Sequence, residues 1–189
     1  MFAFKKKYFL IINNIKDINL NKINRNHKLI IIFRNLNNFK DKDKLLNFRR
    51  KCKLLRIKFF VANDLNLATF LKSDGLYISA SNKSYRPLQL KKINKEIIGS
   101  AHDVKQIYEK INQGCSNILV SKLFQVEYDQ QSKVMGLVKF NNLVHHFKNI
   151  VPLGGIKMSN LNKMLSIRCN GFAIMTEIKK KPAISNRLF

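Results

Sequence analysis

Two adjacent glycines, Gly154 and Gly155, follow a short apolar run at residues 150–153. Because glycine lacks a Cβ and adopts positive φ readily, the backbone N–H groups of such a turn can approach a ligand closely. Ser159 or Asn160 is a suitable cap for a helix that begins beyond the turn. A buried strand, a bare glycine turn and a helix N-terminus together favour an anion site. The alternative is an ordinary turn from strand to helix.

A carboxylate and an amide, Asp64 and Asn63, follow another apolar run at residues 58–62. A carboxylate that faces a phosphate is typical of a bridging Mg²⁺. Asn and Asp are also the residues that cap helices most often, so a helix cap is the alternative interpretation. Ser100 and His102 follow a third run, and for them a helix start is likewise the alternative.

These polar residues are positioned by short apolar runs, which alternate with helical spacing or loops. The predicted strands lie at residues 8–12, 29–33, 58–62, 76–78, 96–100, 117–121, 150–153 and 171–175. Helices are predicted at residues 41–56, 65–71, 88–95, 104–113, 140–147 and 160–167, with weaker helical spacing over 13–27. Alternation of strands with helices is typical of a parallel α/β sheet, and eight units favour a closed barrel. We therefore expect one small (β/α)₈ TIM barrel over residues 1–189, with trimmed N-terminal and C-terminal parts and a basic tail at 179–189.

In such a barrel the carboxyl ends of all strands meet at the rim that carries active sites. The polar residues that follow the predicted strands are then neighbours: Arg34, Asn63, Asp64, Ser100, His102, Ser121, Gly154, Gly155 and Thr176. Barrels commonly hold a phosphate at the loop after the seventh strand and the end of the eighth. Gly154, Gly155, Met175 and Thr176 are the candidate phosphate-binding residues.

The chain is strongly basic: 36 Lys and Arg against 11 Asp and Glu give a net charge of +25. Such a charge is typical of proteins that bind nucleic acids or anionic membranes. The alternative is compositional drift, because Lys, Asn, Ile and Phe are abundant throughout and the basic residues form no single block. We favour drift, and we expect neither a nucleic-acid nor a membrane partner.

Three widely spaced cysteines, Cys52, Cys115 and Cys169, form no CxxC pair and favour a reducing compartment over a disulfide framework. The four histidines include no HExxH motif, which argues against zinc. The apolar run that ends at Ile12 is too short for a signal sequence or a membrane span. We expect a cytoplasmic protein, and the sequence does not determine its oligomeric state.

Six stretches, in order from Ile57 to Ile178, resemble the thiamine-phosphate synthase family and its TenI-like relatives. They read FVANDLNLA at 60–68, SDGLYI at 73–78, IIGSAH at 97–102, GCSNILVSKLF at 114–124, VPLGGI at 151–156 with Asn160, and NGFAI at 170–174. The family is a barrel that joins hydroxymethylpyrimidine diphosphate to thiazole phosphate with Mg²⁺ and releases pyrophosphate. The resemblance therefore implies a transferase with small phosphorylated substrates.

The resemblance also implies roles for particular residues. Asp64 would hold the metal, and Arg34, Asn63 and Ser100 would act at the pyrimidine diphosphate. The thiazole phosphate would lie against Gly155, in the turn described above, and against Thr176. The reaction is a dissociative displacement, which needs neutralisation of the leaving diphosphate more than a strong base.

The chain departs from the family pattern around the diphosphate. Ile32 and Leu36 replace a Gln and a Lys of the family, and Asn82 replaces its second metal-binding Asp. Residues 126–129 replace a Thr-x-Thr-Lys segment, and Lys133 is a candidate substitute for the lost cation. Two alternatives to a synthase are therefore a TenI-like isomerase or phosphate-binding paralogue, and a basic RNA-associated barrel.

Overall fold

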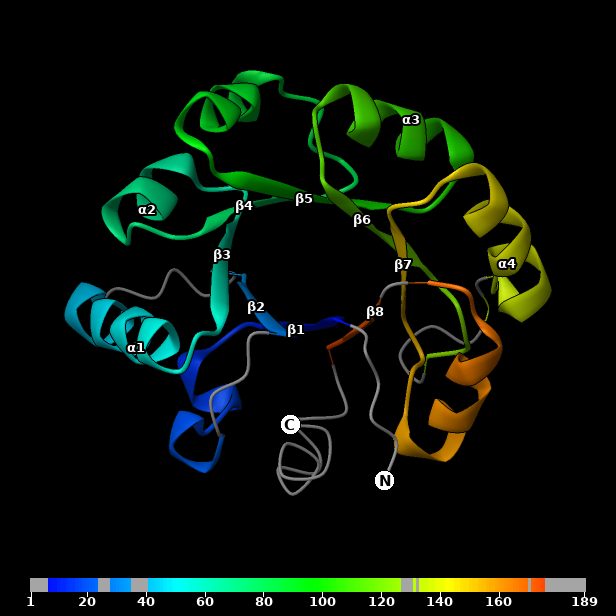
Figure 1. Cartoon of the computed structure of the whole chain (residues 1–189), viewed down its shortest axis with the longest axis horizontal. Helices are drawn as coiled ribbons and strands as arrows, with labels where there is room; N and C mark the ends of the chain where they lie inside the picture. Colours follow the sequence, from blue (N-terminus) through cyan, green and yellow to red (C-terminus); the bar gives the residue numbers. More distant parts are fainter. Residues whose placement is uncertain are drawn as a thin grey trace.

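Eight parallel strands close into a barrel in chain order, as the apolar runs predict (Figure 1). The computed structural model describes residues 7–23, 28–34, 41–126, 131, 133–169 and 171–175. The strands are β1 (Lys7–Ile12), β2 (Leu29–Phe33), β3 (Lys58–Ala62), β4 (Gly75–Ile78), β5 (Glu96–Ala101), β6 (Asn117–Ser121), β7 (Ile150–Leu153) and β8 (Gly171–Ile174). β1 pairs with both β2 and β8, so the described strands leave no open edge.

Each strand is buried on both faces, which explains why the strands read as nearly continuous apolar runs. In β1, Phe9 and Ile11 point into the barrel, whereas Tyr8, Leu10 and Ile12 pack in the outer core. All eight strands contribute to the inner core: Phe9, Ile11, Ile30, Ile32, Phe60, Tyr77, Ile98, Leu119, Val151 and Ala173. The barrel interior is therefore filled, and a ligand can bind only at an end.

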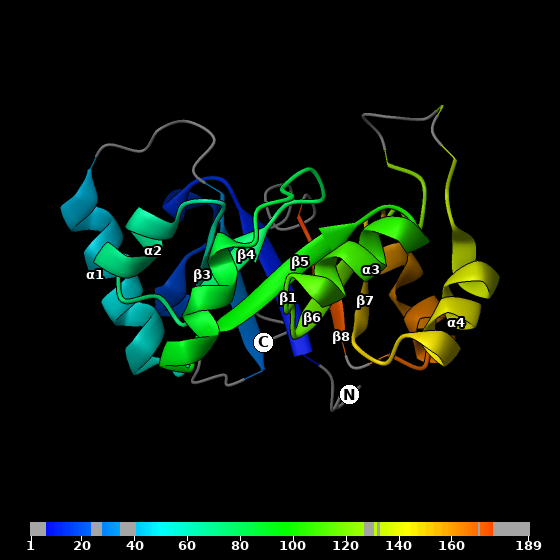
Figure 2. The ribbon, with the colours of Figure 1, turned by 90° about the horizontal axis from the view of Figure 1, so that it is seen from above.

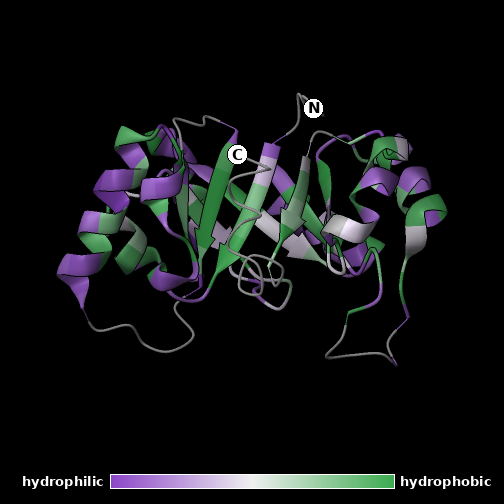
Figure 3. Cartoon of the chain, turned by 90° about the horizontal axis from the view of Figure 1, so that it is seen from below, coloured by the Kyte–Doolittle hydropathy of each residue, from purple (hydrophilic) through white to green (hydrophobic). Residues whose placement is uncertain are grey.

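Helices surround the barrel in the described part of the chain (Figures 1 and 2). The α-helices are α1 (Lys42–Leu54), α2 (Leu65–Phe70), α3 (Val104–Asn112) and α4 (Gly136–His146). The other connections contain 3₁₀ helices: η1 (Ile15–Asp17), η2 (Leu20–Lys22), η3 (Arg86–Ile93) and η4 (Met158–Ser166). The strands are largely hydrophobic, whereas the helices mix hydrophobic and hydrophilic residues (Figure 3). In α1, for example, Leu45, Phe48 and Cys52 are buried and the lysines are exposed.

Two sequence expectations about the connections need correction. The predicted helices at 88–95 and 160–167 are 3₁₀ helices. The helix start also differs in position: η4 begins at Met158 with Lys157 at the N-cap, and Asn160 contributes to the cap from the third helical position, where its side chain accepts from the Lys157 backbone N–H. Short connections must still span adjacent strands, and a 3₁₀ helix rises further per residue than an α-helix.

The cysteines, the lengths of the helices and the basic tail are the other features that the sequence singled out. The three cysteines are free thiols. Within the described ranges, no helix combines the length and the apolar character needed to cross a membrane. The predicted tail at 179–189 lies outside the described residues.

A buried ion pair joins α1 to the connection between β3 and β4. Arg49 is 7% exposed, and its Nη2 donates to Asp74 Oδ1 at 3.0 Å and to the Lys72 carbonyl at 3.2 Å. The other Asp74 oxygen accepts from the Phe59 backbone N–H at 2.8 Å. The pair thus fixes the start of β3 and β4 relative to the outer helix.

We expect Arg49→Met to lower the free energy of unfolding by about 2 kcal/mol, because it leaves a half-buried carboxylate without its guanidinium. Urea denaturation measures this change. Arg50→Met is the matched control, since Arg50 is the exposed neighbour on the same helix. Equal stability of the two variants would contradict a structural role for the ion pair.

Candidate active site

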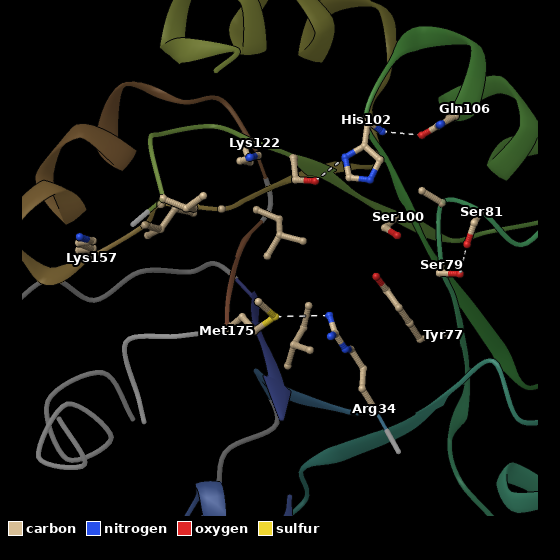
Figure 4. A pocket seen from close by; sticks show the side chains of 18 residues that line it. Arg34, Tyr77, Ser79, Ser81, Ser100, His102, Gln106, Lys122, Lys157 and Met175 are labelled. Atoms are coloured by element: carbon tan, nitrogen blue, oxygen red, sulfur yellow. Dashed lines mark hydrogen bonds between the residues drawn. The ribbon is translucent and has the colours of Figure 1, made fainter. Parts of the chain in front are cut away.

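A cavity of about 650 Å³ lies at the carboxyl ends of the strands (Figure 4). Ile11 and Tyr77 belong to both the inner core and the cavity wall, so the cavity sits directly on the packed barrel interior. The cavity is surrounded by residues at or just beyond the ends of the strands, among them Arg34, Ser100, His102, Ser121, Gly154, Gly155 and Met175. The closed barrel therefore brings together residues that are distant in the chain, such as Arg34 and Met175, which are 141 positions apart.

Most residues predicted for the rim line this cavity, including the candidate phosphate-binding residues Gly154, Gly155 and Met175. Asn63 and Asp64 lie at the same rim, directly after β3, but do not line the cavity. Thr176 lies outside the described residues. The chemical role of each residue remains a prediction.

The two glycines adopt the conformation that their lack of a side chain allows. Gly154 has φ 94° and Gly155 has φ 67°. A Cβ on Gly155 would lie 2.4 Å from the Phe124 carbonyl oxygen and 2.6 Å from that of Gln125. Gly155 is therefore required for the turn to pack against the loop after β6, in addition to any role in ligand approach.

The side chain of Asn160 holds this turn through two hydrogen bonds. Its Nδ2 donates to the Gly155 carbonyl at 2.8 Å, and its Oδ1 accepts from the Lys157 backbone N–H at 2.8 Å. Among the described residues, no hydrogen bond engages the backbone N–H of Gly155 or of Ile156. Both residues line the cavity, so their N–H groups are suited to bind an anion.

The charge of the cavity wall also favours an anionic ligand. Arg34, Lys122 and Lys157 line the cavity, whereas none of the described lining residues is Asp or Glu. Arg34 is oriented by Met175, whose Sδ accepts from Arg34 Nη1 at 3.4 Å. Cations inside a concave, partly dry site attract an anion more strongly than the same charges on an open surface.

Hydroxyl, imidazole and amide groups form the part of the wall that faces the two lysines (Figure 4). Ser121 Oγ and His102 Nδ1 lie 2.9 Å apart, and the His102 backbone N–H donates to Gln106 Oε1 at 2.8 Å. Burial raises the pKa of the Tyr77 phenol, while a hydrogen bond with Ser100 and the charge of Arg34 act in the opposite direction. Burial dominates, so Tyr77 is a neutral hydroxyl at physiological pH.

Asn63 and Asp64 are engaged in local structure. Asp64 is the N-cap of α2, and its Oδ1 accepts from the Leu67 backbone N–H at 2.8 Å. Asn63 has φ 56°, and its Oδ1 accepts from the Ser79 backbone N–H at 3.0 Å and from Asn82 Nδ2 at 3.1 Å. The helix-cap interpretation of Asp64 is thus confirmed, and its metal role remains a prediction.

Mg²⁺ prefers one or two carboxylates together with phosphate oxygens. None of the described residues that line the cavity is Asp or Glu, and the nearby carboxylate of Asp64 lies outside the cavity wall and caps α2, so the donor set does not fit this ion. Asn82, the counterpart of the second acidic ligand, uses its Oδ1 to accept from the Ser84 backbone N–H at 2.9 Å. No group of three or more His, Cys, Asp or Glu suited to a metal occurs in the described ranges.

Sequence reasoning missed two of the three cavity cations, Lys122 and Lys157. Lys122 directly follows β6, which was a usable signal, but in so basic a chain a single lysine does not stand out. Lys133, the predicted substitute cation, is exposed and does not line the cavity. Leu36 and residues 127–129 lie outside the described residues.

Comparison with known proteins identifies the relatives of this barrel. The model of a family described as thiamine monophosphate synthase matches residues 25–178. A thiamine-phosphate synthase of Geobacillus thermodenitrificans is 24% identical over 142 residues, which cover 71% of this chain and 62% of the relative. Another, of Clostridioides difficile, is 22% identical over 147 residues, covering 77% of this chain and 70% of the relative.

Solved structures support the same fold. A thiamine phosphate pyrophosphorylase from Pyrococcus furiosus superposes with a TM-score of 0.74 at 18% identity, covering 98% of this chain and 95% of the other. A phosphoribosyl anthranilate isomerase from Thermotoga maritima gives a TM-score of 0.65 at 11% identity, with coverage of 97% and 100%. At these identities the structural matches show the barrel alone.

We expect Lys122→Met and Lys157→Met each to weaken binding of inorganic phosphate about tenfold, the effect of losing one charge-assisted hydrogen bond. Isothermal titration calorimetry measures the affinity. Lys139→Met, an exposed position on α4 away from the cavity, is the control for net charge. If all three variants bind phosphate like the parent chain, the cavity is not the anion site.

Proposed function

Because this chain belongs to the thiamine monophosphate synthase family, we propose that it joins hydroxymethylpyrimidine diphosphate to thiazole phosphate in thiamine biosynthesis. The matched part of the chain covers 62% of the length of the Geobacillus relative, so the reaction is a proposal for this chain. Both substrates are small and phosphorylated, in agreement with the cationic cavity at the carboxyl rim.

One observation carries the proposal: the cavity offers anion-binding groups on two sides. Lys122 and Lys157 lie on one side of the cavity, and Arg34 and Tyr77 lie apart from them (Figure 4). The glycine turn belongs to the side of Lys122, because Gly154 packs against that side chain. A site for two phosphorylated molecules needs such a division, because two anions in one subsite would repel each other. The arrangement supports a two-substrate reaction over capture of a single phosphate.

We assign the thiazole phosphate to the glycine turn, where Gly155, Ile156 and Lys157 line the cavity. Met175, which lines the cavity, is assigned to the same phosphate, and the resemblance alone assigns Thr176, which lies outside the described residues. The diphosphate is assigned to Arg34 and Ser100. Asn63 does not reach the cavity and therefore acts by holding the loop that follows β4.

In the proposed reaction the bond between the pyrimidine methylene carbon and the diphosphate oxygen breaks, and the electron pair leaves with pyrophosphate. The thiazole nitrogen donates its lone pair to the same carbon and forms the new C–N bond. No proton must be removed, so a strong base is unnecessary. The chief requirement is positive charge beside the departing oxygen, which Arg34 and Lys122 can supply.

The resemblance implies Mg²⁺, which would supply further positive charge to the leaving group. Because the donor set at Asp64 and Asn82 does not fit this ion, the proposed mechanism contains no step through it. We also propose that residues 1–189 act as one domain and that the reaction takes place in the cytoplasm, with no membrane or nucleic-acid partner.

The direct test incubates the purified chain with both substrates and measures pyrophosphate release and thiamine phosphate formation. We expect turnover by the parent chain and a loss of at least about a hundredfold with Arg34→Met, because the leaving group loses a preorganised cation. Arg50→Met, on the outer face of α1, controls for net charge and should retain the parent rate.

Absence of pyrophosphate in every condition, with and without Mg²⁺, would exclude the synthase proposal. Thermal stabilisation by thiazole phosphate without turnover would instead favour the isomerase-like or ligand-binding paralogue. Stabilisation by RNA but by neither substrate would favour the RNA-associated barrel.

A further inference from the structure

The loop after β4, residues 79–85, is held in place by a buried lysine on α3. Lys110 is fully buried, and its Nζ donates to the Asn82 carbonyl at 2.6 Å and to Gln113 Oε1 at 2.8 Å. Gln113 Nε2 donates in turn to the Asn82 carbonyl at 3.0 Å and to the Ser84 carbonyl at 2.9 Å. Lys110 in α3 and Gln113 at its C-cap therefore hold the loop at Asn82 and at Ser84.

The same loop is fixed from the other side by the end of β3. Asn63 Oδ1 accepts from the Ser79 backbone N–H and from Asn82 Nδ2, as described above. Ser79 and Ser81, from this loop, line the cavity, and their hydroxyls lie 3.1 Å apart. The network thus determines the position of one polar wall of the site.

Each polar group that faces this edge already has a partner within the protein. The side-chain oxygen of Asn82 accepts from Ser84, that of Asn63 accepts twice, and one oxygen of Asp64 caps α2. In addition, the Lys110 amine lies against the Asn82 carbonyl. A divalent cation here would have to displace these hydrogen bonds and would meet a like charge.

From these contacts we propose that the chain binds the diphosphate of its substrate without a divalent metal. Arg34 and Lys122 neutralise the anion, and Lys110 and Gln113 are positioning residues that hold the loop of residues 79–85. This inference rests on the proposed function, since it takes a diphosphate as the ligand. Guanidinium and ammonium groups bind phosphate oxygens directly through charge-assisted hydrogen bonds, so the protein alone can supply the recognition.

The first experiment measures binding of inorganic pyrophosphate to the full chain by calorimetry, in EDTA and in millimolar Mg²⁺. We expect binding in EDTA to be at least as tight as in Mg²⁺, because Mg²⁺ screens the charge that the protein cations recognise. Binding that is more than threefold tighter with Mg²⁺, or that occurs only with Mg²⁺, would overturn the inference.

The second experiment tests the positioning role with Lys110→Met, which keeps the apolar stem and removes the amine. We expect pyrophosphate affinity to fall severalfold and backbone hydrogen exchange to increase within residues 79–85. Lys105→Met removes a charge from an exposed position of α3 and should change neither property. Increased exchange throughout the barrel, with none specific to the loop, would show a general structural role and overturn the positioning assignment.

If Lys110→Met does not fold, Gln113→Leu provides the same test, because it removes both donor contacts to the loop and leaves the lysine in place. The substrate assay separates this inference from the proposed function. Turnover that requires Mg²⁺ would overturn metal independence and leave the synthase proposal standing. Pyrophosphate binding in EDTA without turnover would support metal independence and overturn the synthase proposal.

Discussion

The closure of eight short parallel strands into one ring is the constraint on which the other features of the molecule depend. Because β1 pairs with β8 as well as with β2, every described strand has neighbours on both sides. The ring is small enough for side chains from all eight strands to fill it, which leaves the carboxyl rim as the place for a cavity. Closure also brings Arg34 and Met175 within hydrogen-bonding distance across the ends of β2 and β8.

The cavity at this rim combines two kinds of group that bind anions. The glycine turn offers backbone N–H groups, and it can do so because Asn160 and the loop after β6 hold it in a left-handed conformation. Arg34, Lys122 and Lys157 add full charges from three other positions. Fixed dipoles and cations that already point into the cavity need little reorganisation when an anion binds, which favours phosphorylated ligands.

The edge near β3 and β4 shows how a site can change while the fold is kept. Asp64 and Asn63 have the residue types of a metal site, yet their oxygens stabilise a helix terminus and a loop. Lys110 and Gln113 hold the same loop from α3. Hydrogen bonds within the protein thus engage Asp64 Oδ1 and the side-chain oxygens of Asn63 and Asn82, and in the proposed site cations of the cavity wall bind the anion instead.

The sequence by itself determined the strands, their number and the glycine turn. These features depend on local apolar runs and on backbone freedom, which are properties of consecutive residues. It also determined that polar residues follow the strands, and through the barrel rule it brought Arg34, Ser100, His102, Ser121 and the two glycines together. It did not distinguish α from 3₁₀ connections, because tertiary packing decides how tightly a short connection must wind. Only the tertiary structure decided which rim residues line the cavity and that Asp64 caps α2. It also decided that Lys122 and Lys157, out of 36 basic residues, line the cavity. The physical reason is that side-chain direction and hydrogen-bond partners depend on segments far away in the chain, which no local pattern encodes.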